Sequence, residues 1–204
     1  MIKNMDKDTK KAILDLLDKL STIEYINPES IPSIELYMDQ VTSFIDGQLA
    51  GSKRNEDDKL LTKTMINNYT KNDLLPPPVK KKYSKEHLLS LIFIYYLKNI
   101  LSINDIHSVL KPITEKYFGN KDGHDFEDIY AEIFRMEKEE STKLLKEFSK
   151  KYAISKETFA DFPEEDQNML HAFSYICLLS FDVYMKKQLI EKIVDDVFSE
   201  NEEA

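Results

Sequence analysis

The sequence predicts an all-α protein, and three observations carry this prediction. Glycine occurs only 4 times in 204 residues. Alternating runs rich in valine and threonine, which are typical of strands, do not occur either. Apolar residues instead recur at helical spacing in most segments. Hydrophobic residues make up 42% and charged residues 32% of the chain, a composition typical of a globular protein rather than a disordered one.

The first half of the chain is predicted to contain two helices before a polar loop. An amphipathic helix is expected over residues 7–23, and Pro28 and the residues around it break it. Ser33 is the expected N-cap of the second helix, and either Gly47 or Gly51 is expected to end it. Residues 48–58 are polar and are expected to form a loop.

The rest of the chain is organised around residues 62–106, where a short polar helix, a basic turn and a very apolar helix follow one another. Thr62 is the expected N-cap of the short helix, and Met65, Ile66 and Tyr69 form its apolar face. Three consecutive prolines at 76–78 end this helix and force an extended path. This order predicts a winged helix-turn-helix domain.

The helix after the basic turn is predicted to be the central post of that domain. Ser84 is its expected N-cap, and His87 stands where an acidic residue would complete a capping box. Residues 88–97 are apolar all round the helix, so most of its sides must be covered. Ser102 is expected to cap a further short helix.

The C-terminal part is predicted to be helical throughout. A charged amphipathic helix is expected over residues 126–151, and a last helix over residues 163–198. Because the middle of the last helix is apolar nearly all round, it is either the core of a bundle or the interface of a homodimer. Three parts are therefore expected: an N-terminal helix that packs on the body (1–30), the winged helix-turn-helix domain (31–118) and a C-terminal helical bundle or dimerisation region (123–204).

Double-stranded DNA is the partner that the central segment favours. Although the net charge is −9, residues 53–98 hold ten basic and five acidic residues. Lysine, asparagine and threonine side chains on a helix can contact base edges and phosphates in the major groove. We expect five residues to read bases: Lys63, Thr64, Asn67, Asn68 and Lys71. Lys80, Lys81 and Lys82 are expected to hold phosphate from the wing.

The same stretch resembles the DNA-binding domain of the mercury-resistance-regulator (MerR) family over roughly residues 60–110. The residues that fall at that family's intervals are Ile66, Tyr69, Leu74, Leu75, Pro77, Tyr83, Ser84, Leu91, Ile94, Leu97, Ser102, Ile103 and Ile106. Asn67, Asn68 and Asp73 depart from its pattern. The resemblance implies a MerR-like fold, DNA binding and dimerisation through the C-terminal part. The whole chain is also similar to an uncharacterised family of cytosolic Gram-positive bacterial proteins said to have this kind of domain.

Other functions are less well supported by the sequence. Catalytic spacings, phosphate-binding glycine loops and metal-ligand motifs are absent, so we expect no enzyme, no cofactor and no metal site. Cys177 lies in an apolar run and is expected to be a buried hydrophobic residue in a reducing, cytoplasmic protein. No apolar run is long enough to span a membrane. The alternative function is a protein-interaction module that keeps the helix-turn-helix scaffold, favoured if the acidic residues at 56–58 cover the lysines.

Overall fold

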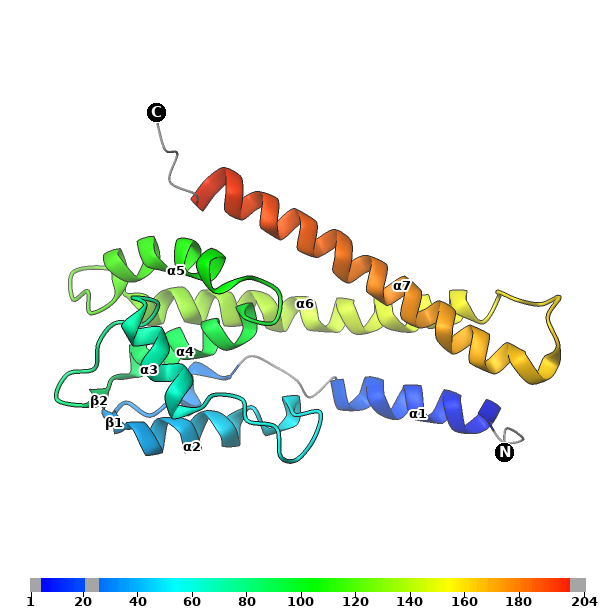
Figure 1. Ribbon diagram of the computed structural model, residues 1–204, viewed down its shortest axis with the longest axis horizontal. Coiled ribbons are helices and arrows are strands. Elements are labelled where there is room, and N and C mark those ends of the chain that lie inside the picture. Colours follow the sequence, from blue (N-terminus) through cyan, green and yellow to red (C-terminus); the bar gives the residue numbers. More distant parts are fainter. Residues whose placement is uncertain (1–4, 21–25, 199–204) are drawn as a thin grey trace. The chain divides into compact units, whose positions relative to one another are not determined.

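The computed structural model describes residues 5–20 and 26–198, and in the first helix it describes the side chains of residues 11, 13 and 15–20 only (Figure 1). Within this part of the chain, the regular secondary structure is helical apart from one antiparallel pair of short strands, which confirms an all-α protein. The α-helices are α1 (Met5–Leu20), α2 (Met38–Gln48), α3 (Lys63–Lys71), α4 (Lys85–Leu97), α5 (Ile103–Tyr117), α6 (Phe126–Ser155) and α7 (Glu164–Ile193).

The remaining elements are short. Two 3₁₀ turns are η1 (Pro28–Ser30) and η2 (Ala50–Ser52), and α7 continues into a π-helical turn, η3 (Val194–Phe198). The strands are β1 (Leu36–Tyr37) and β2 (Lys82–Tyr83). The helix predicted over residues 7–23 corresponds to α1, and its predicted last three residues lie outside the described part.

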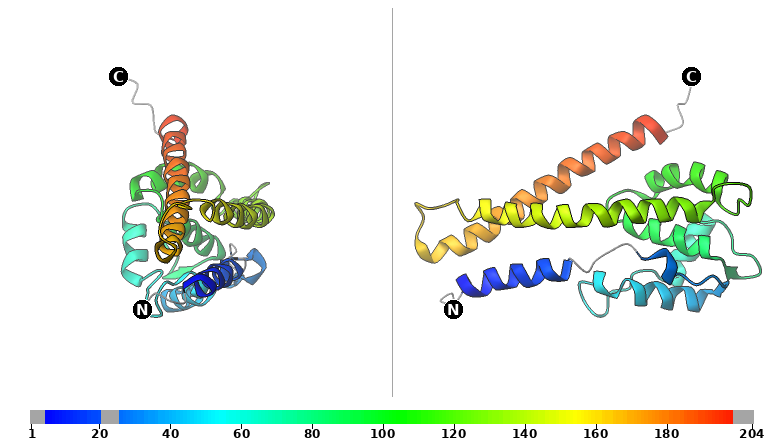
Figure 2. Two further views of the ribbon diagram at one scale, coloured as in Figure 1. Left: turned by 90° about the vertical axis from the view of Figure 1, so that its right-hand side faces the viewer. Right: turned by 180° about the vertical axis from the view of Figure 1, so that it is seen from behind.

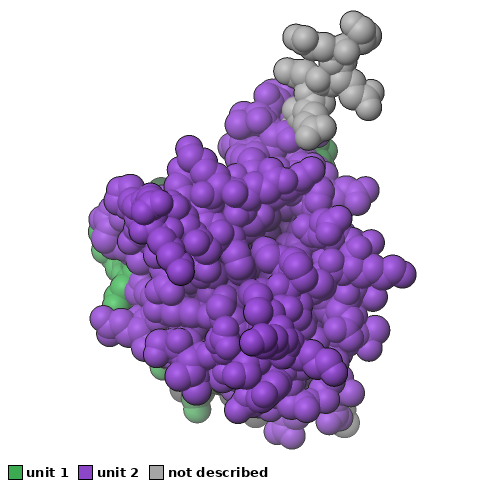
Figure 3. Space-filling model, turned by 90° about the vertical axis from the view of Figure 1, so that its left-hand side faces the viewer, with its two compact units in different colours: residues 1–24, 137–188 green, residues 25–136, 189–204 purple. Residues whose placement is uncertain are grey.

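The chain divides into two compact units, coloured separately in Figure 3. Unit 1 consists of Met1–Glu24 and Glu137–Gln188. Unit 2 consists of Tyr25–Met136 and Leu189–Ala204. The helices α6 and α7 therefore each contribute to both units. The turn between α5 and α6, where the domain boundary is predicted, lies inside unit 2.

The core of unit 2 is built around α4, as predicted for the central post. Figures 1 and 2 show α2, α3, α5 and the first turns of α6 grouped around it. All residues from His87 to Tyr95 are buried. The ring of Phe93 packs edge-on against Phe126 and Tyr130 of α6, and the Tyr130 hydroxyl donates a hydrogen bond to the Ile26 carbonyl at 2.7 Å.

The start of α4 is held by the histidine at the capping-box position. The backbone N–H of Ser84 donates to Nδ1 of His87 at 3.0 Å, so the imidazole does what a glutamate usually does there. The ring is buried between Tyr83 and Phe118, with centroids at 5.5 and 4.8 Å. Burial lowers the pKa of His87, and the Pro77 and Pro76 carbonyls and the charge of Glu35 offset part of this effect.

Unit 1 holds a pair of helical segments from α6 and α7. Tyr175 is buried, donates to the Phe148 carbonyl at 3.2 Å and packs edge-on against Tyr152. Lys151 forms ion pairs with Glu147 and with Asp182 of α7. One side of α7 is therefore packed within unit 1.

The exposure of Cys177, on another side of α7, differs from what the sequence predicts. Cys177 is exposed, so the prediction of a buried thiol is wrong. Ile176 and Phe181 in the same apolar run are exposed as well, whereas Tyr175 is buried because it lies on the side of α7 that faces α6. An apolar run predicts a helix whose side chains prefer to be buried, but it does not show which other part of the protein buries them.

Candidate nucleic-acid interface

The helix α3 separates its two faces as its sequence predicts. The Thr62 hydroxyl caps it by accepting from the Met65 N–H at 3.1 Å, and Ile66 and Tyr69 are buried. The five residues expected to read bases are all exposed: Lys63, Thr64, Asn67, Asn68 and Lys71. The helix ends where the Tyr69 carbonyl accepts from the N–H groups of Leu74 and Leu75.

The predicted wing is a tight β-hairpin. Val79 and Lys82 exchange two backbone hydrogen bonds, at 3.1 and 2.9 Å, around the two central residues Lys80 and Lys81. Both central residues have positive φ, 50° and 64°. This is the backbone of a type I′ turn, which favours Asn-Gly and is costly for residues with a long side chain. Lys80 and Lys81 are exposed, and Lys82 is partly exposed.

Both basic elements contact the short segment 35–39, which the sequence did not identify as part of the site. The strand β1 pairs with β2, placing Tyr37 opposite Lys82. The ammonium of Lys82 lies 5.7 Å from the centroid of the Tyr37 ring and 3.8 Å from the Glu35 carboxylate. Two residues of strand are too short to give an alternating pattern, so this pairing had no usable sequence signal.

The same segment also reaches α3, because Asp39 in the first turn of α2 forms an ion pair with Lys63. Segment 35–39 therefore joins the N-terminal end of α3 to the hairpin. Lys71 lies at the other end of α3, away from this junction. Among the described residues, no ion-pair partner is found for Lys71, Lys80 or Lys81.

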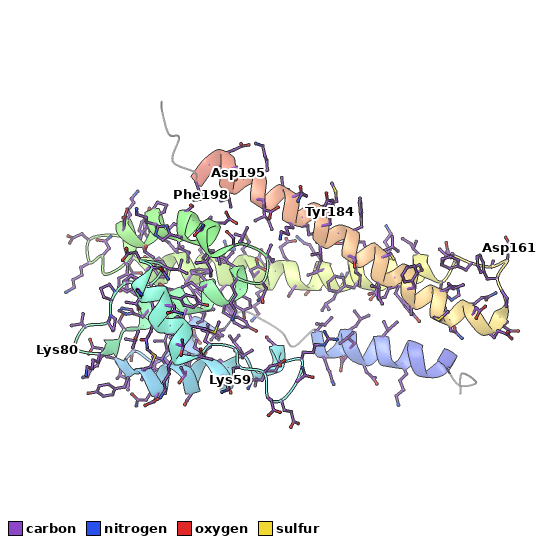
Figure 4. All side chains as sticks on the ribbon, viewed as in Figure 1. Lys59, Lys80, Asp161, Tyr184, Asp195 and Phe198 are labelled. Atoms are coloured by element: carbon purple, nitrogen blue, oxygen red, sulfur yellow. The ribbon has the colours of Figure 1, made fainter. Side chains whose placement is uncertain are left out.

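The acidic residues at 56–58 lie elsewhere on unit 2. Together with Lys53 and Lys59 they line a shallow hollow of about 390 Å³ beside the C-terminal half of α2. The Asp58 carboxylate accepts from the backbone N–H groups of Asn55 and Arg54, at 2.9 and 3.1 Å, and the Asn55 bond is the main cause of its lowered pKa. Figure 4 shows Lys59 and Lys80 in separate parts of unit 2. These acidic residues therefore leave the hairpin uncovered.

One protein-family model matches the chain, over residues 26–133, and it is described as a domain of unknown function, DUF1836. The chain belongs to the DUF1836 family. The matched residues cover α2 to α5, the sheet and the first turns of α6, so the DUF1836 domain and the first segment of unit 2 nearly coincide. No curated protein and no solved structure matches the chain.

The DUF1836 domain and the C-terminal turn of unit 2 enclose one further hollow, of about 730 Å³. It lies between α5 and η3, and its lining residues are His107, Ser108, Lys111, Pro112, Glu115, Val197 and Phe198. None of the residues expected to contact DNA lines it. Within the described residues, no cluster of three or more metal-ligating side chains is found, and no helix is long and apolar enough to cross a membrane.

Proposed function

We propose that the DUF1836 domain of this chain is a MerR-like winged helix-turn-helix that binds double-stranded DNA, and that the protein is a non-catalytic transcriptional regulator in the cytoplasm. The order of elements supports this proposal: β1, α2 and α3 are followed by the hairpin, β2, α4 and α5. In such domains a helix enters the major groove and a neighbouring β-ribbon contacts the backbone.

The observation that carries the proposal is the conformation of the hairpin tip. Two lysines occupy backbone positions that cost about 1 kcal/mol each for residues other than glycine, asparagine and aspartate. No ion pair with the described residues compensates for this cost, and both side chains face solvent. Strain of this kind is often kept where a side chain is needed for binding. Two unpaired cations at an exposed tip are suited to phosphate contact.

The polar face of α3 supplies the groups that base contact requires. Asn67 and Asn68 are exposed in the middle of the helix and can present amide groups to adenine. Lys80, Lys81 and Lys82 would hold phosphate, while Lys63 and Lys71 reach bases or phosphates at the two ends of α3. Because one helix reads only a few base pairs, we expect two copies of the chain to bind two half-sites.

A selection from a random duplex library, followed by a salt titration, tests this function. The wild-type protein is compared with a Lys80→Ala/Lys81→Ala/Lys82→Ala variant. We expect an enriched motif, affinity that falls steeply with salt, and a slope smaller by up to about 3 in the variant. The matched control replaces three exposed lysines elsewhere in unit 2, Lys111, Lys116 and Lys121, and should keep the wild-type slope. No enrichment and no binding at low salt would contradict the proposal.

A specific observation favours the second candidate function, a protein-interaction module on the same scaffold. Lys63 and Lys82, one from each basic element, are paired with Asp39 and Glu35. These ion pairs reduce the positive charge available to a polyanion, and the chain as a whole is acidic. Loss of DNA enrichment together with capture of a protein by the exposed α3 face would establish this function instead.

A further inference from the structure

Two carboxylates from segment 35–39 are paired with lysines of the candidate interface. Asp39, in the first turn of α2, forms an ion pair with Lys63, the first residue of α3. The carboxylate of Glu35, just before β1, lies 3.8 Å from the ammonium of Lys82. All four side chains are partly or largely exposed, so a larger anion can approach each ion pair from the solvent. We call Glu35 and Asp39 the paired acids.

The backbone holds the paired acids next to the two basic elements. The pairing of β1 with β2 places Tyr37 opposite Lys82, and the Tyr37 ring lies 5.7 Å from the Lys82 ammonium. The Gln40 side chain accepts from the Tyr37 N–H at 2.9 Å and closes the capping box that leads β1 into α2. The paired acids therefore belong to the framework that joins α3 to the hairpin, and not to a loose loop.

Both carboxylates occupy places where a phosphate of DNA is expected to bind. Lys63 begins α3, and the N-terminal end of a helix attracts anions through its free N–H groups and its dipole. Lys82 follows the hairpin tip, whose two lysines are exposed. A lysine ammonium forms the same kind of charge-assisted hydrogen bond with a phosphate oxygen as with a carboxylate oxygen. The paired acids and a DNA backbone therefore compete for the same two ammonium groups.

We propose that Glu35 and Asp39 determine specificity, because each is exchanged for a DNA phosphate only when the duplex docks fully. This inference rests on the proposed function of DNA binding and concerns the regulation of the same surface. Exchange at both ion pairs requires α3 and the hairpin to reach the duplex together, since segment 35–39 joins them. A loosely bound duplex first meets Lys71 and the hairpin-tip lysines, for which the described residues offer no carboxylate partner. The paired acids thus weaken binding to any duplex that does not fit the whole surface.

Neutralising the paired acids without changing their shape tests the proposal on the full chain. The variant is Glu35→Gln/Asp39→Asn. Its matched control, Glu56→Gln/Asp57→Asn, makes the same substitutions at exposed acids beside the hollow on α2. Fluorescence anisotropy measures the affinity of each protein for a random-sequence duplex and for the duplex that the wild type selects. Circular dichroism checks that each protein is folded.

The variant with neutral paired acids should bind the random-sequence duplex roughly 4- to 25-fold more tightly than the wild type. This range corresponds to about 2- to 5-fold for each exposed ion pair. We expect a smaller gain for the selected duplex, because the wild type already makes both exchanges there, so the ratio of the two affinities should fall. The control variant should change either affinity by no more than about 2-fold.

The two lysines show whether the gain comes from exchange at the ion pairs. The same acid substitutions are made in a Lys63→Ala/Lys82→Ala protein, which has no ammonium group to release. Exchange predicts that the gain disappears in this protein, whereas general repulsion of DNA by the acids predicts the same gain. An equal gain in both proteins, or in the control variant, overturns the proposal. If the double variant does not fold, Glu35→Gln, which lies outside any helix, is compared in the same way with and without Lys82→Ala.

Retention on heparin, a sulfated polyanion, separates this inference from the proposed function. Elution from heparin needs no DNA sequence and reports how strongly the free cations of the protein bind an anion. If the wild type binds no duplex but Glu35→Gln/Asp39→Asn elutes at higher salt than its control, DNA binding fails and competition for the lysines is supported. If duplexes bind but the variant and its control elute together, DNA binding stands and the inference is overturned.

Discussion

The helices α4 and α7 have the same kind of sequence but opposite surroundings. The helix α4 and the middle of α7 are apolar nearly all round, and neither has a clear polar face. In α4 every residue from His87 to Tyr95 is buried, whereas α7 keeps most of its large apolar residues at least half exposed. The difference shows that an apolar sequence predicts a helix whose side chains prefer to be buried. The number of elements packed around the helix decides whether they are buried within the monomer.

Alanine substitutions in the two helices should have very different effects on the stability of the monomer. Leu91 is fully buried in α4, so we expect Leu91→Ala to lower the free energy of unfolding by about 2–5 kcal/mol. Phe173 is 60% exposed on α7, and Phe173→Ala should cost less than about 0.5 kcal/mol in the monomer. Urea unfolding at low protein concentration, where a dimer is dissociated, measures both. Equal losses would show that α7 is covered within one chain.

The pH dependence of stability should report on how α4 begins. The pKa of His87 is lowered by burial, so the unfolded chain takes up a proton more readily than the folded protein. The contribution of His87 is therefore fully present above about pH 6.5, the unperturbed value, and is lost as the pH falls below it. Protonation also turns Nδ1 into a donor, which ends the hydrogen bond from the Ser84 N–H.

A His87→Gln variant separates this effect from other titrations, because glutamine can still accept the Ser84 N–H but does not titrate. Urea unfolding of wild type and variant is compared between pH 7.5 and pH 5. We expect the stability of wild type to fall more steeply with decreasing pH than that of the variant. Parallel curves would mean that His87 does not link α4 capping to pH.

At the hairpin tip, substitution should raise the stability of the protein by a small amount. Replacing Lys80 and Lys81 by Asn and Gly fits the type I′ turn, so we expect a gain of about 1 kcal/mol in the free energy of unfolding and weaker DNA binding. A Lys80→Ala/Lys81→Ala variant removes the same charges without relieving the backbone, and should leave stability nearly unchanged. Thermal unfolding of the two variants and wild type measures the difference. A gain in both variants would show that charge repulsion, not backbone conformation, limits the turn.

The candidate site shows how far local sequence information reaches. The two faces of α3 followed from its helical period, and its start followed from the Thr62 hydroxyl. The ion pairs of Lys63 with Asp39 and of Lys82 with Glu35 could not be predicted from the sequence, because each joins residues more than twenty positions apart. Long-range pairs depend on how the helices pack, so no periodicity or spacing reveals them.

The sequence by itself determined most of the helices, the caps of α3, α4 and α5, and the buried α4 helix of unit 2, because these depend on hydrogen bonds and periodicity within a few residues. The predicted cap of the second helix is wrong: α2 begins at Met38 with Tyr37, not Ser33, as its N-cap. Only the tertiary structure decided that segment 35–39 joins α3 to the hairpin and that the acidic residues at 56–58 lie elsewhere. It also decided that Cys177, in the apolar middle of α7, is exposed while the apolar α4 is buried. The reason is physical: burial depends on which surfaces the rest of the fold brings together, and that is a property of the assembled molecule, not of any one segment.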